Sequence, residues 1–174
     1  MYRVIGVLST LGMLLWLTAT ATAGAPLVQA HGGGTGTFNA DLDADGDIDG
    51  SQFGFGVTID SASSARGHFT CVMAGRSDIL GLSVMAVQGK VTSGLRNGDG
   101  SVTFSGVGSV NLGQGQKFTG VPFAVTVTSG GPGVGTLTLT VIGAFDGVPG
   151  DTLPGNGNYD LPTEIVQSGQ IAID

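Results

Sequence analysis

The chain is poor in the residues that most often form crosslinks or catalytic sites. Among its 174 residues, one is cysteine and two are histidine, and Glu164 is the only glutamate. With Cys71 alone, an intramolecular disulfide is impossible, so stability has to come from packing or from a bound metal. A glycosidase that works through two carboxylates would have to build its site from aspartates.

Basic residues are also scarce, and none occurs between Arg3 and Arg66. The chain has 6 Lys and Arg against 13 Asp and Glu, which gives a formal net charge of −7. An acidic chain of this kind is a poor ligand for nucleic acid or for an anionic membrane. We therefore expect its partner to be a protein or a small-molecule ligand.

The N-terminal segment has the features of a signal peptide. A short positive start ending at Arg3 precedes an apolar stretch over Val4–Leu17, and small residues follow. The apolar stretch is shorter than the ~20 residues that a spanning helix needs. We predict a signal helix within residues 1–30, with cleavage after Ala23 or Ala30, and a secreted, extracellular product that has no membrane contact after cleavage.

Glycine is abundant, with 33 residues, but it follows no three-residue period. It is interleaved with β-branched and aromatic residues, as in Phe53–Ile59, where large apolar side chains alternate with small or polar ones. Such alternation is typical of a half-buried β-strand. Similar patterns, separated by turn signals such as Asn97–Gly100, predict further strands over 69–73, 80–86, 90–95, 102–105, 107–112, 118–128, 134–145 and 170–173.

Residues 31–174 are therefore predicted to form a single Gly-rich domain of the all-β class. We expect an antiparallel β-sandwich or a partly closed barrel of about 8–10 strands. The sequence pattern does not separate these two architectures.

A run of alternating aspartates is the most specific motif of the chain. Five carboxylates occur within nine residues, with glycine at the sixth position of the run and isoleucine at the eighth: Asp41, Asp43, Asp45, Gly46, Asp47, Ile48 and Asp49. Adjacent like charges repel by up to about 1 kcal/mol per pair at 4 Å in water. A divalent cation bound by the carboxylate oxygens turns this repulsion into attraction, so the run indicates a metal site.

The run resembles the twelve-residue calcium loop of EF-hands and dockerins. The resemblance assigns Asp41, Asp43 and Asp45 to ligand positions one, three and five. It gives Asp47 the backbone-carbonyl position and Asp49 position nine. Gln52 occupies position twelve, where the family has a bidentate glutamate, which implies weaker binding. The flanking segments look like strands, so the resemblance covers the loop and not the helix pair.

One alternative to calcium binding at this loop remains open, and the sequence also contains a second candidate segment. The run is also compatible with a solvated acidic turn that binds nothing. A second oxygen-rich segment, Asp146–Glu164, offers further carboxylate and amide ligands, although ordinary Pro/Gly turns explain its composition as well: Asp146, Asp151, Asn156, Asn158 and Asp160.

No catalytic constellation is found in the sequence. His68 and Cys71 are three positions apart on a predicted strand, so their side chains point to opposite faces. We expect Cys71 to be a small core residue and the protein to be non-catalytic. The alternatives are a β-barrel or sandwich that binds a small ligand among its loops, and a hydrolase that uses aspartates and a metal-bound water.

Three segments resemble those of Gly-rich secreted bacterial domains of the kind found beside choice-of-anchor surface modules. They are Phe53–Val57, Gly67–Cys71 and Gly169–Ile171. The resemblance implies a secreted β domain that serves as a structural or interaction module, and it brings no functional residues with it.

Overall fold

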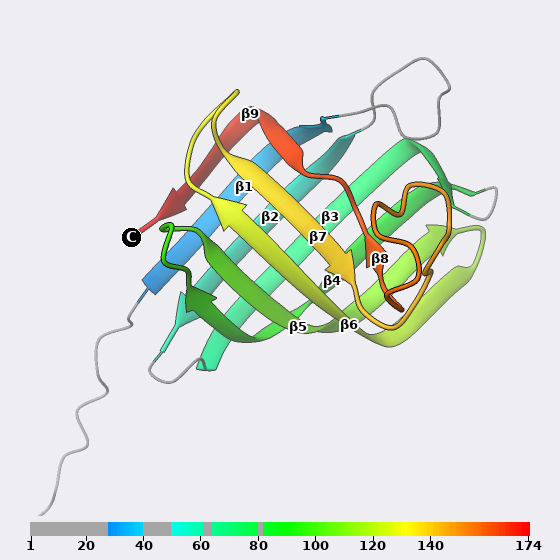
Figure 1. Cartoon of the computed structure of the whole chain (residues 1–174), viewed down its shortest axis with the longest axis horizontal. Coiled ribbons are helices and arrows are strands. Elements are labelled where there is room, and N and C mark those ends of the chain that lie inside the picture. Colours follow the sequence, from blue (N-terminus) through cyan, green and yellow to red (C-terminus); the bar gives the residue numbers. More distant parts are fainter. Residues whose placement is uncertain (1–27, 40–49, 61–63, 80–81) are drawn as a thin grey trace, which may run out of the picture.

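The computed structural model describes residues 28–39, 50–60, 64–79 and 82–174. Within these ranges the chain forms nine strands and no helix (Figure 1). The strands are β1 (Val28–Phe38), β2 (Gly50–Ile59), β3 (Ser64–Ile79), β4 (Leu82–Arg96), β5 (Val102–Gly113), β6 (Gln116–Thr128), β7 (Thr136–Val141), β8 (Tyr159–Asp160) and β9 (Glu164–Ile173). The all-β prediction and the predicted number of strands are confirmed, whereas the predicted signal helix lies outside the described residues.

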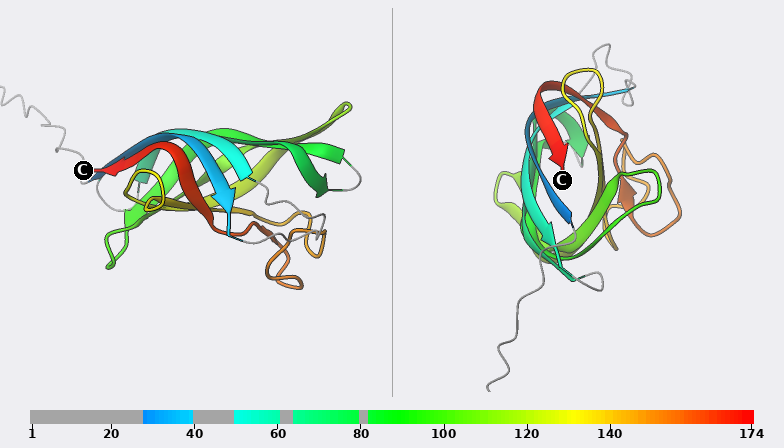
Figure 2. Two further views of the ribbon diagram at one scale, coloured as in Figure 1. Left: turned by 90° about the horizontal axis from the view of Figure 1, so that it is seen from above. Right: turned by 90° about the vertical axis from the view of Figure 1, so that its left-hand side faces the viewer.

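All strands belong to one antiparallel sheet with the order β6-β5-β4-β3-β2-β1-β9-β7-β8. The sheet curls until β6 also pairs with β7, from Phe123↔Val141 to Thr128↔Thr136. The β7–β9 pairing is much shorter and comprises Thr136↔Ile165 and Leu137↔Glu164. The strands therefore form a flattened, partly closed ring rather than two separate sheets (Figure 2).

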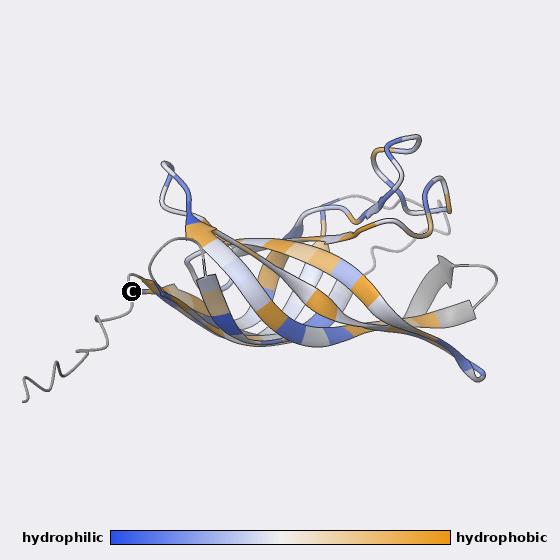
Figure 3. Cartoon of the chain, turned by 90° about the horizontal axis from the view of Figure 1, so that it is seen from below, coloured by the Kyte–Doolittle hydropathy of each residue, from blue (hydrophilic) through white to orange (hydrophobic). Residues whose placement is uncertain are grey.

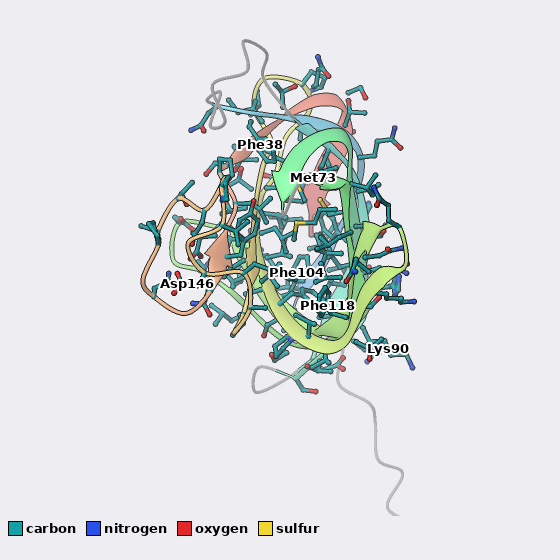
Figure 4. The ribbon with its side chains drawn as sticks, turned by 90° about the vertical axis from the view of Figure 1, so that its right-hand side faces the viewer. Phe38, Met73, Lys90, Phe104, Phe118 and Asp146 are labelled. Carbon is teal, nitrogen blue, oxygen red and sulfur yellow. The ribbon has the colours of Figure 1, made fainter. Side chains whose placement is uncertain are left out.

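The core fills the interior of this ring. Along most of the strands, large apolar residues and some glycines point inward and mainly polar residues point outward, which gives the alternating hydropathy seen in Figure 3. Phe69 and Phe104 are 0% and 1% exposed, and Figure 4 shows Phe104 inside the ring with Lys90 outside it. The ring of Phe69 lies 5.9 Å from that of Phe104 and 5.5 Å from that of Phe123.

Inward-facing glycines create the space that these aromatic rings occupy. A Cβ atom at Gly89 would approach Cε1 of Phe123 to 2.7 Å, and one at Gly32 would approach Cε1 of Phe55 to 2.9 Å. Alternation of large and small residues fills the narrow interior without voids. The glycine content therefore reflects packing inside the sheet as well as turns.

This packing explains where the predicted strand boundaries were wrong. Segments 80–86 and 90–95 were predicted as separate strands, but residues 82–96 form the continuous strand β4, and 102–105 and 107–112 likewise belong to the single strand β5. Gly89 and Gly106 lay between the predicted ranges, whereas they belong to β4 and β5 and lie beside the Phe123 ring. The turn at Asn97–Gly100 is confirmed, with the Asn97 amide donating to the Ser101 carbonyl at 2.8 Å.

Candidate functional site

The acidic run lies in the connection between β1 and β2, and its five aspartates are outside the described residues. The strands on both sides are well defined, because Thr37 pairs with Gly50 and Thr35 with Gln52. Gln52, assigned to the last ligand position, belongs to β2 and has an exposed side chain. The two ends of the connection are thus held next to each other by the sheet.

A shallow polar depression of about 310 Å³ borders the strand ends that flank the acidic run. It is lined by Thr35, Gly36, Thr37, Gly50, Ser51, Gln52, Val72 and Gln167. Gln52 and Thr35 contribute outward-facing polar groups to it, and Thr35 shares a hydrogen bond of 2.8 Å with Ser168. This depression is the part of the candidate calcium site's surroundings that the structure describes.

A buried carboxyl group lies directly inside the same strand ends. Glu164 is 2% exposed, and the Ser51 hydroxyl donates a hydrogen bond of 2.6 Å to its Oε2 atom. Burial raises the pKa of Glu164 to about 7, although the hydrogen bond from Ser51 acts in the opposite direction. The absence of a side chain at Gly36, which faces this carboxyl group, leaves the space that the carboxyl group occupies.

Sequence reasoning missed Glu164 as a site residue. The segment 161–164 was interpreted as a loop, but Glu164 begins β9 and pairs with Phe38 and Leu137. The burial of Glu164 was indicated by the alternation of inward and outward residues along β9, because Glu164 shares the inward face with Val166. The only glutamate of the chain thus stands at a core position.

Cys71 and His68 are not a catalytic pair. Cys71 is fully buried and points into the ring, whereas His68 is exposed on the outer face of β3, as predicted. Burial raises the pKa of the Cys71 thiol, the negative charge of Glu164 raises it further, and a hydrogen bond with Ser51 has the opposite effect. A thiol held in its protonated form is a poor nucleophile.

The second oxygen-rich segment is an ordered loop between β7 and β9. Oδ1 of Asp146 accepts a hydrogen bond of 2.6 Å from the Gly155 amide, and its Oδ2 accepts one of 3.1 Å from the Gly157 amide. Asp151 accepts backbone hydrogen bonds from Gly147 at 2.8 Å, Leu153 at 3.0 Å and Asp160 at 3.2 Å. Desolvation would raise the pKa of Asp151, but these hydrogen bonds outweigh it and lower the pKa.

Side-chain oxygen atoms of Asp160 and Asn158 in this loop also accept hydrogen bonds. Asp160 accepts hydrogen bonds of 2.7 Å from the Thr140 hydroxyl and 2.6 Å from the Asn156 side-chain amide. Oδ1 of Asn158 accepts a hydrogen bond of 3.1 Å from the Gly143 amide. Across the described ranges, no three His, Cys, Asp or Glu side chains are grouped to hold a metal ion. The contacts therefore favour a structural role for these side chains over the metal site considered from sequence.

The strand ends that flank the acidic run and the loop that carries Asp146 belong to the same end of the ring. The end of β1 and the start of β2 lie at the end from which the loop carrying Asp146 projects (Figure 1, Figure 4). The chain termini of the described domain, near Val28 and Asp174, lie at the opposite end, where the Gln29 and Asp174 backbones exchange hydrogen bonds.

Comparisons with protein-family models, curated proteins and solved structures gave no match for this chain. In the part of the chain that the structure describes, there is no helix of sufficient length and hydrophobicity to span a membrane.

Proposed function

We propose that this protein is a secreted, non-catalytic β domain that binds calcium at Asp41–Asp49 and acts as a structural or interaction module. The observation that carries this proposal is the position of the acidic run between two paired neighbouring strands. Because Thr37 and Gly50 are registered partners, the run has to return to its starting point within a short span. The sequence places five carboxylates within nine residues of this connection, a spacing that favours a hard divalent cation.

Calcium suits this position better than magnesium. Calcium accepts six to eight oxygen ligands in flexible geometry, whereas magnesium requires a near-ideal octahedron and keeps much of its water. Gln52 provides one neutral amide oxygen where EF-hand loops have the two oxygen atoms of a bidentate glutamate carboxylate. We therefore expect an affinity in the range of extracellular modules, with Kd roughly 10⁻⁴ to 10⁻³ M.

The packed interior supports a binding role on the outside of the ring. Phe55, Phe69, Phe104 and Phe123 fill the centre and contact one another with ring centroids 5.4 to 5.9 Å apart. A partner or ligand would therefore be held by the loops and the outer face rather than by the interior. The end of the ring that carries the Asp146–Glu164 loop, the end of β1 and the start of β2 is the surface on which we place that interaction.

Secretion is proposed with cleavage after Ala23 rather than after Ala30. Val28 and Ala30 are 6% and 0% exposed and belong to β1. Ala30 pairs with Val57 on one side and with Ile173 on the other. Cleavage after Ala30 would remove three residues of β1, two of them buried, whereas cleavage after Ala23 leaves β1 complete.

Thermal unfolding followed by far-UV circular dichroism tests the calcium proposal. A ligand that binds only the folded state stabilises it by RT ln(1 + [L]/Kd), which is on the order of 1 kcal/mol for millimolar calcium at the affinity given above. We expect calcium to raise the melting temperature over that in EDTA, with a smaller effect of magnesium. The Asp41→Ala/Asp45→Ala variant should lose this response, and Asp174→Asn, an exposed aspartate at the opposite end, should keep it.

A further inference from the structure

The two histidines of the chain lie in one row of the sheet, on either side of a glycine. His31 of β1 pairs with Gly56 of β2, and Gly56 pairs with His68 of β3. Both histidines are exposed, and so is Gly56, which means that all three positions face outward on the same side of the sheet. His31 and His68 are 37 positions apart in the sequence, so only strand register brings them together.

The surface between the two imidazoles is open. A Cβ atom at Gly56 would meet no other atom within 4 Å. Beside His31 the surface is hollowed into a depression of about 380 Å³ lined by His31, Gly32, Gly33, Phe55, Gln170 and Ala172. The three strands are neighbours in the sheet and belong to one wall of the flattened ring (Figure 2).

The spacing between His31 and His68 suits a single atom that is bound by both imidazoles. Neighbouring strands lie about 4.8 Å apart, so the two Cα atoms are separated by roughly 10 Å across Gly56. Two imidazoles that lean toward each other over the glycine, each with a metal–nitrogen bond of about 2.0–2.1 Å, can span this distance. A bulky residue at position 56 would stand between them.

From the positions of these two residues we infer that His31 and His68 form a surface site for a metal ion of intermediate hardness, such as Cu²⁺, Ni²⁺ or Zn²⁺. Imidazole nitrogen is a preferred ligand of these metals, whereas calcium requires oxygen. Two protein ligands leave the remaining coordination positions to water or to a group from a partner. This site is independent of the proposed calcium loop in both its residues and its metal.

The positive charge of Lys90 lowers the affinity of the site for a metal cation. Lys90 pairs with His68 on the side away from Gly56 and is exposed. Its positive charge repels a bound cation at short range, although water and salt screen much of this effect. Replacement of Lys90 by alanine therefore tightens metal binding, which distinguishes a site at His68 from a site elsewhere on the chain.

The test is isothermal titration of the untagged chain with CuCl₂, NiCl₂ and ZnCl₂, with CaCl₂ as the comparison metal. We expect one transition-metal ion per chain, with copper bound most tightly in accordance with the Irving–Williams order. His31→Ala and His68→Ala should each weaken metal binding roughly tenfold or more. Removal of a residue that only hydrogen-bonds to a metal ligand already costs about 10–100-fold in affinity, and loss of the ligand itself should cost at least the lower figure. Electron paramagnetic resonance of the copper form should show two imidazole nitrogens.

Two further variants keep the test specific. Gly56→Leu should fold, since its side chain would enter open space, and it should weaken binding by blocking the gap between the imidazoles. Lys90→Ala should strengthen binding. Retention of copper binding in the His31→Ala/His68→Ala variant would overturn the inference. A stoichiometry of one metal per two chains, with a dimer in size-exclusion chromatography, would also overturn it, because the ligands would then come from different copies.

Discussion

Ser51 and Glu164 form a hydrogen bond of 2.6 Å inside the ring, between two residues that are 113 positions apart in the sequence. Ser51 lies on β2 beside the acidic connection, and Glu164 begins β9 next to the short β7–β9 pairing. The contact therefore links the start of β2 to the least extensively paired seam of the ring. In the described part of the chain, the Ser51 hydroxyl is the side-chain donor that faces a charge developing on Glu164.

Stability should fall as the pH rises through the range in which Glu164 ionises. Its pKa is raised from 4.5 to about 7, so the folded state holds the proton more tightly than the unfolded state. The free energy of unfolding contributed by this group is complete below pH 4.5, decreases between pH 4.5 and 7, and is constant above that range. At 1.36 kcal/mol per pKa unit, the decrease is about 3 kcal/mol.

The Glu164→Gln variant isolates this effect, because an amide cannot ionise but can still accept a hydrogen bond from Ser51. Urea unfolding at pH 4 and pH 8 should give similar stabilities for the two proteins at pH 4 and a more stable variant at pH 8. Equal stabilities of variant and parent at both pH values would contradict the burial of an ionisable carboxyl group in the ring.

Truncation of Phe69 should destabilise the fold strongly. Its side chain is 0% exposed and lies between the rings of Phe104 and Phe123. Phe69→Ala is expected to reduce the free energy of unfolding by about 3–5 kcal/mol, as for other buried phenylalanines. Phe118 is 40% exposed, so Phe118→Ala serves as the matched control and should have a clearly smaller effect in the same denaturant titration.

Removal of the Asp146 carboxylate should loosen its loop without unfolding the ring. Asp146 accepts hydrogen bonds from the Gly155 and Gly157 amides, and it lies away from the packed interior of the ring (Figure 4). In Asp146→Ala, amide hydrogen exchange at Gly155 and Gly157 should accelerate, while exchange in β4 and β5 stays at its original rate. Unchanged exchange at the two glycines would mean that other contacts order this loop.

The N-terminus of the exported protein should be Gly24. Cleavage after Ala23 retains Val28 and Ala30 in β1, where both are buried. N-terminal sequencing or intact-mass measurement of the protein recovered from the culture medium gives the cleavage position. A start at His31 would require the ring to form without the first three residues of β1.

Alternation along the strands predicted most of the fold. The inward positions Phe53, Phe55, Val57 and Ile59 are all buried, because period-two patterning reflects which side of a sheet faces the core. The ring closure between β6 and β7 could not be predicted, since it depends on twist and on long-range register. The inclusion of Gly89 and Gly106 in β4 and β5 could not be predicted for a related reason, because the side chain that fills their space, Phe123, comes from another strand.

The candidate sites were predictable to different degrees. The acidic run was evident from composition and spacing alone, and its calcium binding stays a prediction. The Ser51–Glu164 contact and the His31–Gly56–His68 row depend on pairing between strands that are far apart in the sequence. Such relationships become visible only once the register of the sheet is known.

Calorimetric titration of the untagged chain with calcium is the most direct test of the central claim. The account predicts one calcium ion per chain with a Kd of roughly 10⁻⁴ to 10⁻³ M, weaker binding of magnesium, and loss of calcium binding in the Asp41→Ala/Asp45→Ala variant. Absence of calcium binding by the folded parent protein, or binding that survives in this variant, would contradict it and leave the acidic run as a solvated turn.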